Sequence, residues 1–272
     1  DMKHKKTLWL ICMAGLCLVL YTIVISRTEN MTSLIFGGTD GAFVTSDSVN
    51  MTDPNRVSTP EPTEDIWPDI DITLPQYSIV NKDNLLPSAY EPDVGLIAGT
   101  RYMQFALSAK PYLEAMIQDC EAAGFTVIVN GAYRTYSYQN ELFNRKASQI
   151  AYGMGVTDYL DPKYQEAAAE AEKYTMKPGA SEHQLGLAVD LMDKLYTNLN
   201  YEKMDHEMFD WLDEHCAEYG FIKRYPTRKL LLTGYDEPWH YRYVGVEAAT
   251  FIMEHGLCYE EFYKHYVPDF TY

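Results

Sequence analysis

The segment from Ser181 to Asp190, Ser-Glu-His-Gln-Leu-Gly-Leu-Ala-Val-Asp, most constrains how this chain can fold. It places the imidazole of His183 and the carboxylate of Asp190 seven residues apart, a spacing of about two helical turns. Gly186 and the β-branched Val189 lie between them and favour a turn that runs into a strand over a continuous helix. We therefore expect two side chains of metal-ligand type on one turn-and-strand unit.

A third side chain of this type lies fifty residues further along. The segment Asp-Glu-Pro-Trp-His supplies the imidazole of His240 and, three residues before it, the carboxylate of Glu237. Two histidines and one carboxylate from separate segments, with a spare acid, are typical of a catalytic zinc site with one open coordination position. The alternative is that each is an ordinary polar residue, since the chain contains seven histidines.

Glu237 and Arg134 are candidates for the chemistry at such a site. An acid three residues from His240, across Pro238, would reach an activated water and return its proton to a leaving amine. Arg134 follows the β-rich run 125–129, and an arginine in an enclosed pocket needs an anion, such as an oxyanion or a substrate carboxylate. The alternative is that Glu237 is a surface acid on a turn and Arg134 a surface cation.

Residues 76–272 alternate apolar segments with turn signals and are expected to form one domain. Helices and strands follow one another without a regular βαβ repeat, which indicates the α+β class. We expect a small central antiparallel sheet flanked by helices, with the metal site in a cleft on the sheet. The expected helices cover 113–120, a segment starting at 137, 161–174, 209–216, 246–255 and 260–265, and the expected strands cover 125–129 and 240–244.

The first 75 residues have a different character. Residues 7–26 carry no charge and are long enough to cross a bilayer as a helix, and three lysines precede them within the tail 1–6. By the positive-inside tendency this predicts a single-pass signal anchor with a cytoplasmic tail and an extracellular domain. A cleaved signal peptide is the alternative, although no clear cleavage site follows the run. Residues 27–75 contain nine acids and two arginines and are expected to form an acidic, flexible tether.

The charge and cysteine content exclude several classes of partner and site. A net charge of −17 argues against nucleic acid, because phosphate binding requires a basic surface. Cys120 and Cys216 fall on the apolar stripes of expected helices, where free thiols behave as small buried hydrophobes. No cysteine pair has the spacing of a zinc thiolate site, so imidazole and carboxylate remain as ligands, which suit zinc better than magnesium or copper(I).

The order of these motifs resembles that of the VanY-type D-alanyl-D-alanine carboxypeptidases. Their relatives among zinc peptidases include D,D-dipeptidases, L,D-carboxypeptidases and the hedgehog signalling domain. The resemblance covers about residues 78–245, and one departure is Ala132, where relatives often have serine. The motifs that carry it are Ser181-x-His183-x-x-Gly186-x-Ala188-x-Asp190, Glu237-Pro238-Trp239-His240-x-Arg242-Tyr243-Val244-Gly245, Gly131-Ala132-Tyr133-Arg134 and the segment 79–87.

The resemblance implies a role for each candidate residue. It implies that Zn²⁺ is the cofactor and that Glu237 is the general base and acid, while Arg134 steadies the oxyanion. The implied zinc ligands are His183, Asp190 and His240. The implied substrate-pocket residues are Ser181, Gln139 and Trp239.

The expected function is removal of the terminal D-Ala from peptidoglycan stem peptides or their lipid-linked precursors. Such substrates lie outside the cell and close to the membrane, where the anchor would place the domain. By analogy alone, the activity could contribute to glycopeptide resistance. L,D-carboxypeptidase and D,D-dipeptidase activities on the same scaffold remain open alternatives. A non-catalytic zinc-stabilised cell-wall binding module is another, although a purely structural zinc site would need neither Glu237 nor Arg134.

Overall fold

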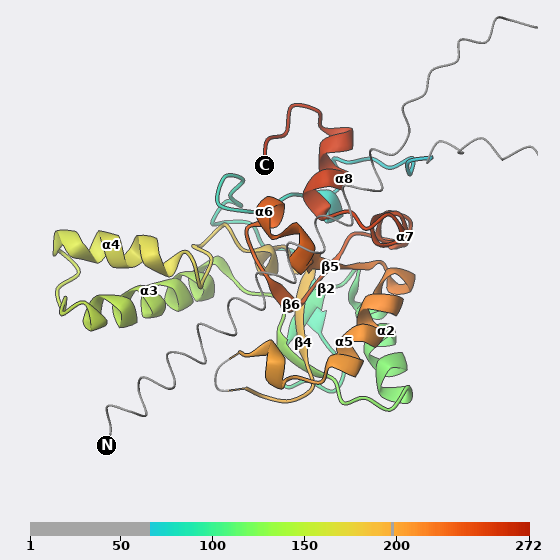
Figure 1. Ribbon diagram of the computed structural model, residues 1–272, viewed down its shortest axis with the longest axis horizontal. Coiled ribbons are helices and arrows are strands. Elements are labelled where there is room, and N and C mark those ends of the chain that lie inside the picture. Colours follow the sequence, from blue (N-terminus) through green and yellow to red (C-terminus); the bar gives the residue numbers. More distant parts are fainter. Residues whose placement is uncertain (1–65, 197–198) are drawn as a thin grey trace, which may run out of the picture. The chain divides into compact units, whose positions relative to one another are not determined.

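The computed structural model describes residues 66–196 and 199–272, and within them a four-stranded antiparallel sheet positions the site (Figure 1). Its strand order is β3-β4-β6-β5, and a separate antiparallel pair is formed by β1 and β2. The predicted α+β class and central antiparallel sheet are confirmed. The strands are β1 (Val94–Leu96), β2 (Gln104–Ala106), β3 (Ile128–Gly131), β4 (Ala188–Met192), β5 (Phe221–Tyr225) and β6 (Glu237–Tyr243).

Helices lie on several sides of this sheet, and the last two elements of the chain are helices (Figure 1). In the described residues no helix combines the length and apolarity that a membrane crossing requires. The expected anchor at 7–26 lies outside the described residues. The α-helices are α2 (Lys110–Ala122), α3 (Tyr136–Gly153), α4 (Pro162–Ala171), α5 (His206–His215), α6 (Leu230–Thr233), α7 (Val246–Glu254) and α8 (Tyr259–Tyr266). The short 3₁₀ helices are η1 (Pro75–Tyr77), η2 (Glu182–Leu185), η3 (Tyr201–Lys203), η4 (Cys216–Tyr219) and η5 (Thr227–Lys229).

One hydrophobic core joins the sheet to α2 and α5. Successive residues of β4 point to opposite faces, so Val189 and Leu191 enter this core while Asp190 faces away from it. Tyr241 on β6 is completely buried in the same core. The sheet therefore has one apolar face that stabilises the fold and a second face on which polar side chains can gather.

A second core is built by α7 and α8. Ile222 from β5 and Val244 just after β6 pack into it. Trp67 also joins it, with its ring 4.5 Å from that of Phe251 and stacked on His265 at 3.8 Å. The packed region thus extends to the N-terminal side of residue 76, the boundary expected from composition.

The helices α3 and α4 lie side by side as an antiparallel hairpin (Figure 1). The helix α3 begins one residue before the predicted start at 137, and Thr135 caps it, since its hydroxyl accepts a hydrogen bond from the Tyr138 amide at 3.1 Å. Asp161 caps α4 in the same way through the Lys163 amide. The predicted helix at 161–174 is correct in place but ends at Ala171.

The turn expected between His183 and Asp190 is present. A 3₁₀ helix, η2, carries His183 and ends at Gly186, whose φ of +73° is in the left-handed region that glycine adopts without strain. The Gly186 carbonyl accepts a hydrogen bond from the Ala106 amide at 2.8 Å, which joins this turn to β2. The chain then enters β4, and all five strand residues are buried.

Candidate active site

The sheet brings Asp190 and His240 together. They are direct partners in the register of β4 and β6, so their side chains project from the same face. His183 approaches from η2, and its ring lies edge-on to that of His240, with 4.9 Å between the centroids. One potential ligand atom from each of the three residues lies within 4.8 Å of the others, and all three residues are buried.

The spacing of these atoms fits a tetrahedral zinc ion. Two ligands about 2.1 Å from a tetrahedral zinc are roughly 3.4 Å from each other. Asp190 Oδ2 lies 3.3 Å from His183 Nε2, and Asp190 Oδ1 lies 3.2 Å from His240 Nδ1. Two imidazoles and one carboxylate also match the donors that zinc prefers. The two distances start from different oxygens of Asp190, and the donor chemistry and approximate spacing of the three residues fit a zinc site.

Each histidine has an acceptor behind it that orients the ring. His183 Nδ1 lies 2.8 Å from the backbone carbonyl oxygen of Ala132, so this nitrogen donates and Nε2 keeps its lone pair for a metal. Ala132, which replaces the serine often found in relatives, therefore orients His183 through its backbone carbonyl and not through its side chain. His240 is turned the other way, with Nε2 at 3.4 Å from a Glu182 carboxylate oxygen and Nδ1 directed at the site.

Gly131 makes room for the Asp190 carboxylate. It is the partner of Asp190 in the register between β3 and β4. A Cβ at this position would clash with Asp190 Oδ2 and would lie 3.0 Å from Nη2 of Arg134. The first residue of the Gly-Ala-Tyr-Arg motif is therefore needed for close packing beside the metal ligands.

Glu237 reaches the site because β6 is irregular. In a regular strand, residues three apart point to opposite faces, which would separate Glu237 from His240. Between Lys223 and Tyr225 of β5, however, the register shifts, and a step of two residues on β5 spans four on β6. Glu237 Oε2 consequently lies 3.6 Å from His240 Nδ1, with 32% of its side chain exposed.

The two histidines of the candidate metal site have shifted pKa values. Burial opposes protonation of His240, but hydrogen bonds to Asp190 and Glu182 outweigh it and raise its pKa to about 9. Burial and the charge of Arg134 lower the pKa of His183 to about 4, so that ring is neutral. Negative charge is thus concentrated around His240 in a way that a cation would relieve.

Two carboxyl groups in the cluster shift in opposite directions. Burial opposes ionisation of Asp190, but its interactions with His183 and His240 outweigh this effect and hold its pKa well below the usual range. Burial raises the pKa of Glu237, and the nearby charge of Asp190 adds to this effect. One carboxylate therefore stays ionised as a ligand type, while the other is suited to exchange protons.

Arg134 and Gln139 line the same cavity, of about 320 Å³. Arg134 Nη2 donates to Asp190 Oδ2 at 3.1 Å, and its Nη1 donates to Gln139 Oε1 at 3.3 Å. Gln139 Nε2 in turn donates to the Met176 carbonyl at 2.7 Å. Ser181 is buried at the cavity wall, just before η2. These three side chains accompany the metal-site residues as the resemblance implies.

Trp239 lies elsewhere. It is separated by one residue from Tyr241 on β6 and packs against the main hydrophobic core, outside the lining of this cavity. Two cations that the sequence reasoning missed, Arg145 and Lys146 on α3, do line the cavity. They lie on a long helix among other polar residues, and no local signal distinguishes them from surface cations.

Sequence reasoning also missed a set of buried charges behind His240, which we call the arginine–glutamate cluster. Each of these side chains is at most 6% exposed. The one available signal was a second acid, Glu182, directly before His183 in the motif 181–190. The cluster consists of Glu182, Arg224, Arg242 and Glu260.

An α+β fold with a histidine and an aspartate on one sheet face, a second histidine on the adjoining 3₁₀ helix, and a glutamate and an arginine beside them defines the metallopeptidase class of site. A family model described as VanY, D-alanyl-D-alanine carboxypeptidase, matches residues 103–246, which include the candidate ligands and Glu237. The chain belongs to this family, as its motifs predict.

Individual relatives agree with this placement. A D-alanyl-D-alanine carboxypeptidase of Enterococcus faecalis is 39% identical over 186 residues, 68% of this chain and 64% of that protein. The chain thus spans slightly less than two thirds of that relative's length.

Solved structures of similar fold include the vancomycin resistance D,D-pentapeptidase VanY from the VanB-type cassette, as a mutant in complex with Zn(II). It is 36% identical with a TM-score of 0.57, covering 70% of this chain and 99% of that one. The LD-carboxypeptidase LdcB is 28% identical with a TM-score of 0.56, covering 70% and 87%.

Proposed function

We propose that this protein is a zinc-dependent D,D-carboxypeptidase that hydrolyses the terminal D-Ala of peptidoglycan stem peptides or their precursors. The observation that carries the proposal is the convergence of Glu237 on the buried His183–Asp190–His240 ligand set. A structural zinc site needs four protein ligands and no spare acid, whereas a catalytic site keeps one position open. Family membership supplies the class of substrate.

The side chains divide the work of peptide hydrolysis. When bound, Zn²⁺ supplies a Lewis acid that polarises the scissile carbonyl and makes water more acidic. Glu237 accepts the proton of the attacking water and delivers it to the nitrogen of the leaving D-alanine. Arg134 donates N–H groups to the carbonyl oxygen as that oxygen becomes anionic.

The cationic lining of the cavity supports recognition of a free C-terminus. Arg145 and Lys146 line the cavity from α3, the helix that also carries Gln139. A carboxypeptidase substrate ends in a carboxylate, and charge-assisted hydrogen bonds from arginine and lysine are strong and directional. In a protein with a net charge of −17, such a group of cations is a specific local feature.

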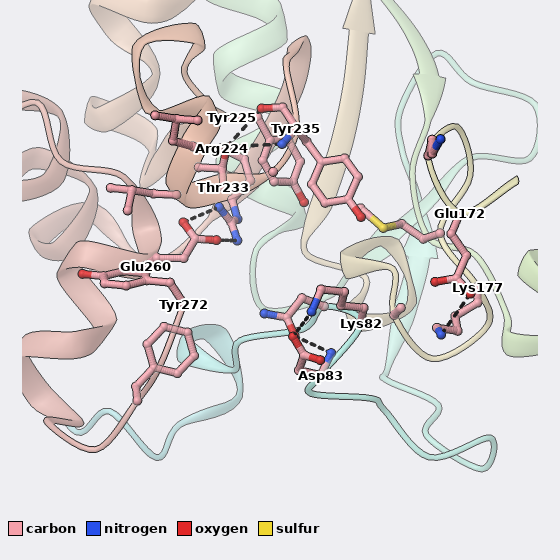
Figure 2. Close-up of a pocket in the computed structure, with 18 residues that line it drawn as sticks. Lys82, Asp83, Glu172, Lys177, Arg224, Tyr225, Thr233, Tyr235, Glu260 and Tyr272 are labelled. Atoms are coloured by element: carbon pink, nitrogen blue, oxygen red, sulfur yellow. Dashed lines mark hydrogen bonds and ion pairs between the residues drawn. The ribbon is translucent and has the colours of Figure 1, made fainter. Parts of the chain in front are cut away.

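A second cavity, of about 430 Å³, adjoins the first (Figure 2). The two cavities share Met176 and Tyr225 in their walls, and Figure 2 shows Tyr225 and Tyr235 on one side of the second cavity and Lys82 on the other. Residues that precede the scissile bond in a longer peptide need such space, whereas a free dipeptide does not. This favours a carboxypeptidase over a D,D-dipeptidase.

We further propose that the protein is anchored by residues 7–26 in the cell membrane with the catalytic domain outside. The uncharged run, the preceding lysines and the extracellular position of the substrate support this. Trimming of D-Ala-D-Ala ends at that place would remove the target of glycopeptide antibiotics, which supports a contribution to resistance.

Product analysis tests the activity. The full chain is incubated with a muramyl pentapeptide ending in D-Ala-D-Ala, with and without a zinc chelator, and the products are read by mass spectrometry. We expect loss of a single alanine that the chelator abolishes. Loss of the dipeptide would indicate a D,D-dipeptidase, and cleavage of a tetrapeptide with one terminal D-Ala would indicate an L,D-carboxypeptidase. No turnover of any of these in the presence of zinc would refute the proposal.

Substrate length tests the second cavity. We expect kcat/KM for the muramyl pentapeptide to exceed that for free D-Ala-D-Ala by at least tenfold, because only the longer peptide reaches beyond Tyr225. A Tyr235→Ala variant should reduce this ratio, since Tyr235 lines the second cavity and lies outside the first. An unchanged ratio would remove the argument from the second cavity.

A further inference from the structure

The arginine–glutamate cluster touches the candidate metal site at one atom. Glu182 uses its two carboxylate oxygens for different partners. Oε1 accepts from Arg224 Nε at 2.8 Å and lies 3.1 Å from Arg242 Nη1, while Oε2 lies 3.4 Å from His240 Nε2. The two arginines therefore fix the carboxylate in place and leave one oxygen for the histidine.

The cluster continues to the C-terminal helix. Arg224 turns its remaining two nitrogens to Glu260 on α8, with Nη1 at 3.0 Å from Oε2 and Nη2 at 2.6 Å from Oε1. Figure 2 shows this paired contact between Arg224 and Glu260. Paired contacts of this kind fix the orientation of a guanidinium as well as its position. Glu260 lies beyond the residues that the family model matches, 103–246.

We propose that Glu182 is a positioning residue for His240, and that Glu260 on α8 supports it through Arg224. This proposal rests on the proposed zinc site. It adds a chain of contacts that runs from His240 through Glu182 and Arg224 to Glu260 on α8. The Glu182 carboxylate accepts the Nε2–H of His240, which fixes the tautomer and aims the Nδ1 lone pair at the metal. A carboxylate that accepts a hydrogen bond from a ligating imidazole also makes that imidazole more basic and therefore a stronger metal ligand.

A cluster that served only as a structural ion network would not need this geometry. Its two arginines and two glutamates already balance in charge, so the third contact of Glu182 with an imidazole is not required for neutrality. His183 offers an internal comparison, because a neutral backbone carbonyl performs the orienting task there.

Zinc affinity of the full chain, measured against a chromophoric chelator, tests the role without reference to turnover. We expect Glu182→Gln to weaken zinc binding by about 10- to 100-fold, the usual cost of losing a partner of a metal ligand. Glu260→Gln should weaken it less, in the same direction. Glu261→Gln is the matched control on α8, because Glu261 faces Lys229 instead, and it should bind zinc like the wild type.

Glu182→Gln leaves two buried arginines short of one negative charge, so a double variant with Arg242→Gln restores the balance. In either variant, a folded protein with wild-type zinc affinity would overturn the proposal. Wild-type protein gives an independent reading through ¹⁵N NMR of its histidines. We expect zinc-loaded His240 to carry its proton on Nε2, and a proton on Nδ1 would overturn the proposal.

These outcomes separate the positioning role from the proposed function. A wild-type chain that binds zinc with the expected tautomer but hydrolyses no D-Ala-ending peptide would refute the activity and support the role of Glu182. A chain that hydrolyses the pentapeptide while Glu182→Gln keeps full zinc affinity would do the reverse.

Discussion

Two groups of buried charges meet at His240, and they differ in how their charges are balanced. The arginine–glutamate cluster contains two positive and two negative side chains, each with partners inside the cluster. The metal-site cluster, defined as His183, Asp190, His240, Glu237 and Arg134, raises the pKa values of His240 and Glu237 instead. In the arginine–glutamate cluster the pKa of Glu182 is lowered and that of Arg224 is raised, so both shifts favour the charged forms and hold structure. In the metal-site cluster the raised pKa of Glu237 favours the neutral acid instead, which suits a group that exchanges protons.

The largest effect is expected from removal of the proton-transfer group. Glu237→Gln should lower kcat/KM for the pentapeptide by about 10⁴-fold, since an amide cannot take the proton of the attacking water. Zinc content, measured by atomic absorption, should remain that of the wild type because Glu237 is not a ligand. An active variant would mean that the base has been misassigned.

Arg242→Leu tests the arginine–glutamate cluster. Its guanidinium is completely buried, pairs with Glu182 and donates to the carbonyls of Gln76 and Ser78. Removal leaves a buried carboxylate with one partner fewer, so we expect a loss of about 3–5 kcal/mol in the free energy of unfolding, measured with urea. The exposed pair of Lys173 and Glu170 provides the control, and Lys173→Met should leave the midpoint unchanged. A similar midpoint for both variants would contradict the distinction.

Gly131→Ala tests how tightly the metal-site cluster is packed. The added methyl group displaces the Asp190 carboxylate, so zinc binding should weaken by about 1–3 kcal/mol, roughly 5- to 150-fold. Gly153→Ala is the matched control, since a Cβ there meets no atom within 4 Å. It lies at the end of α3, where alanine should keep or improve stability. Equal zinc affinity in both variants would show that the β3–β4 contact tolerates extra volume.

A milder test uses pH on the metal-free protein. The pKa of His240 is raised to about 9, so the protonated ring adds stability that is fully present below 6.5, the ordinary value, and is lost as pH rises through 9. Zinc requires the neutral ring, so apparent zinc affinity should rise about tenfold per pH unit between these values. Calorimetric titration in buffers of different ionisation enthalpy checks this by counting released protons. An apparent zinc affinity that does not change with pH would show that His240 carries no proton to be displaced by zinc.

Sequence alone determined the ligand types and the local structure that carries them. Residue chemistry distinguished His183, Asp190, His240 and Glu237 as a candidate site, and Gly186 indicated the turn before the strand. The apolar periodicity located α2, α5 and α7, because the pattern of side chains that a helix buries is local. The order of the motifs was enough to predict the family. The membrane anchor stays a prediction.

Tertiary structure decided what depends on residues distant in sequence. The strand β5 was missed because its five residues include two cations, Lys223 and Arg224, which are not typical of a buried strand. Arg224 is nevertheless buried, since Glu182 and Glu260 balance its charge. Trp239 turned to the core because strand alternation and the irregularity of β6 were set by pairing with β5. Residue types thus predict the ligands, whereas strand register and burial decide which ligand atoms face the site and which charged residues contact them from behind.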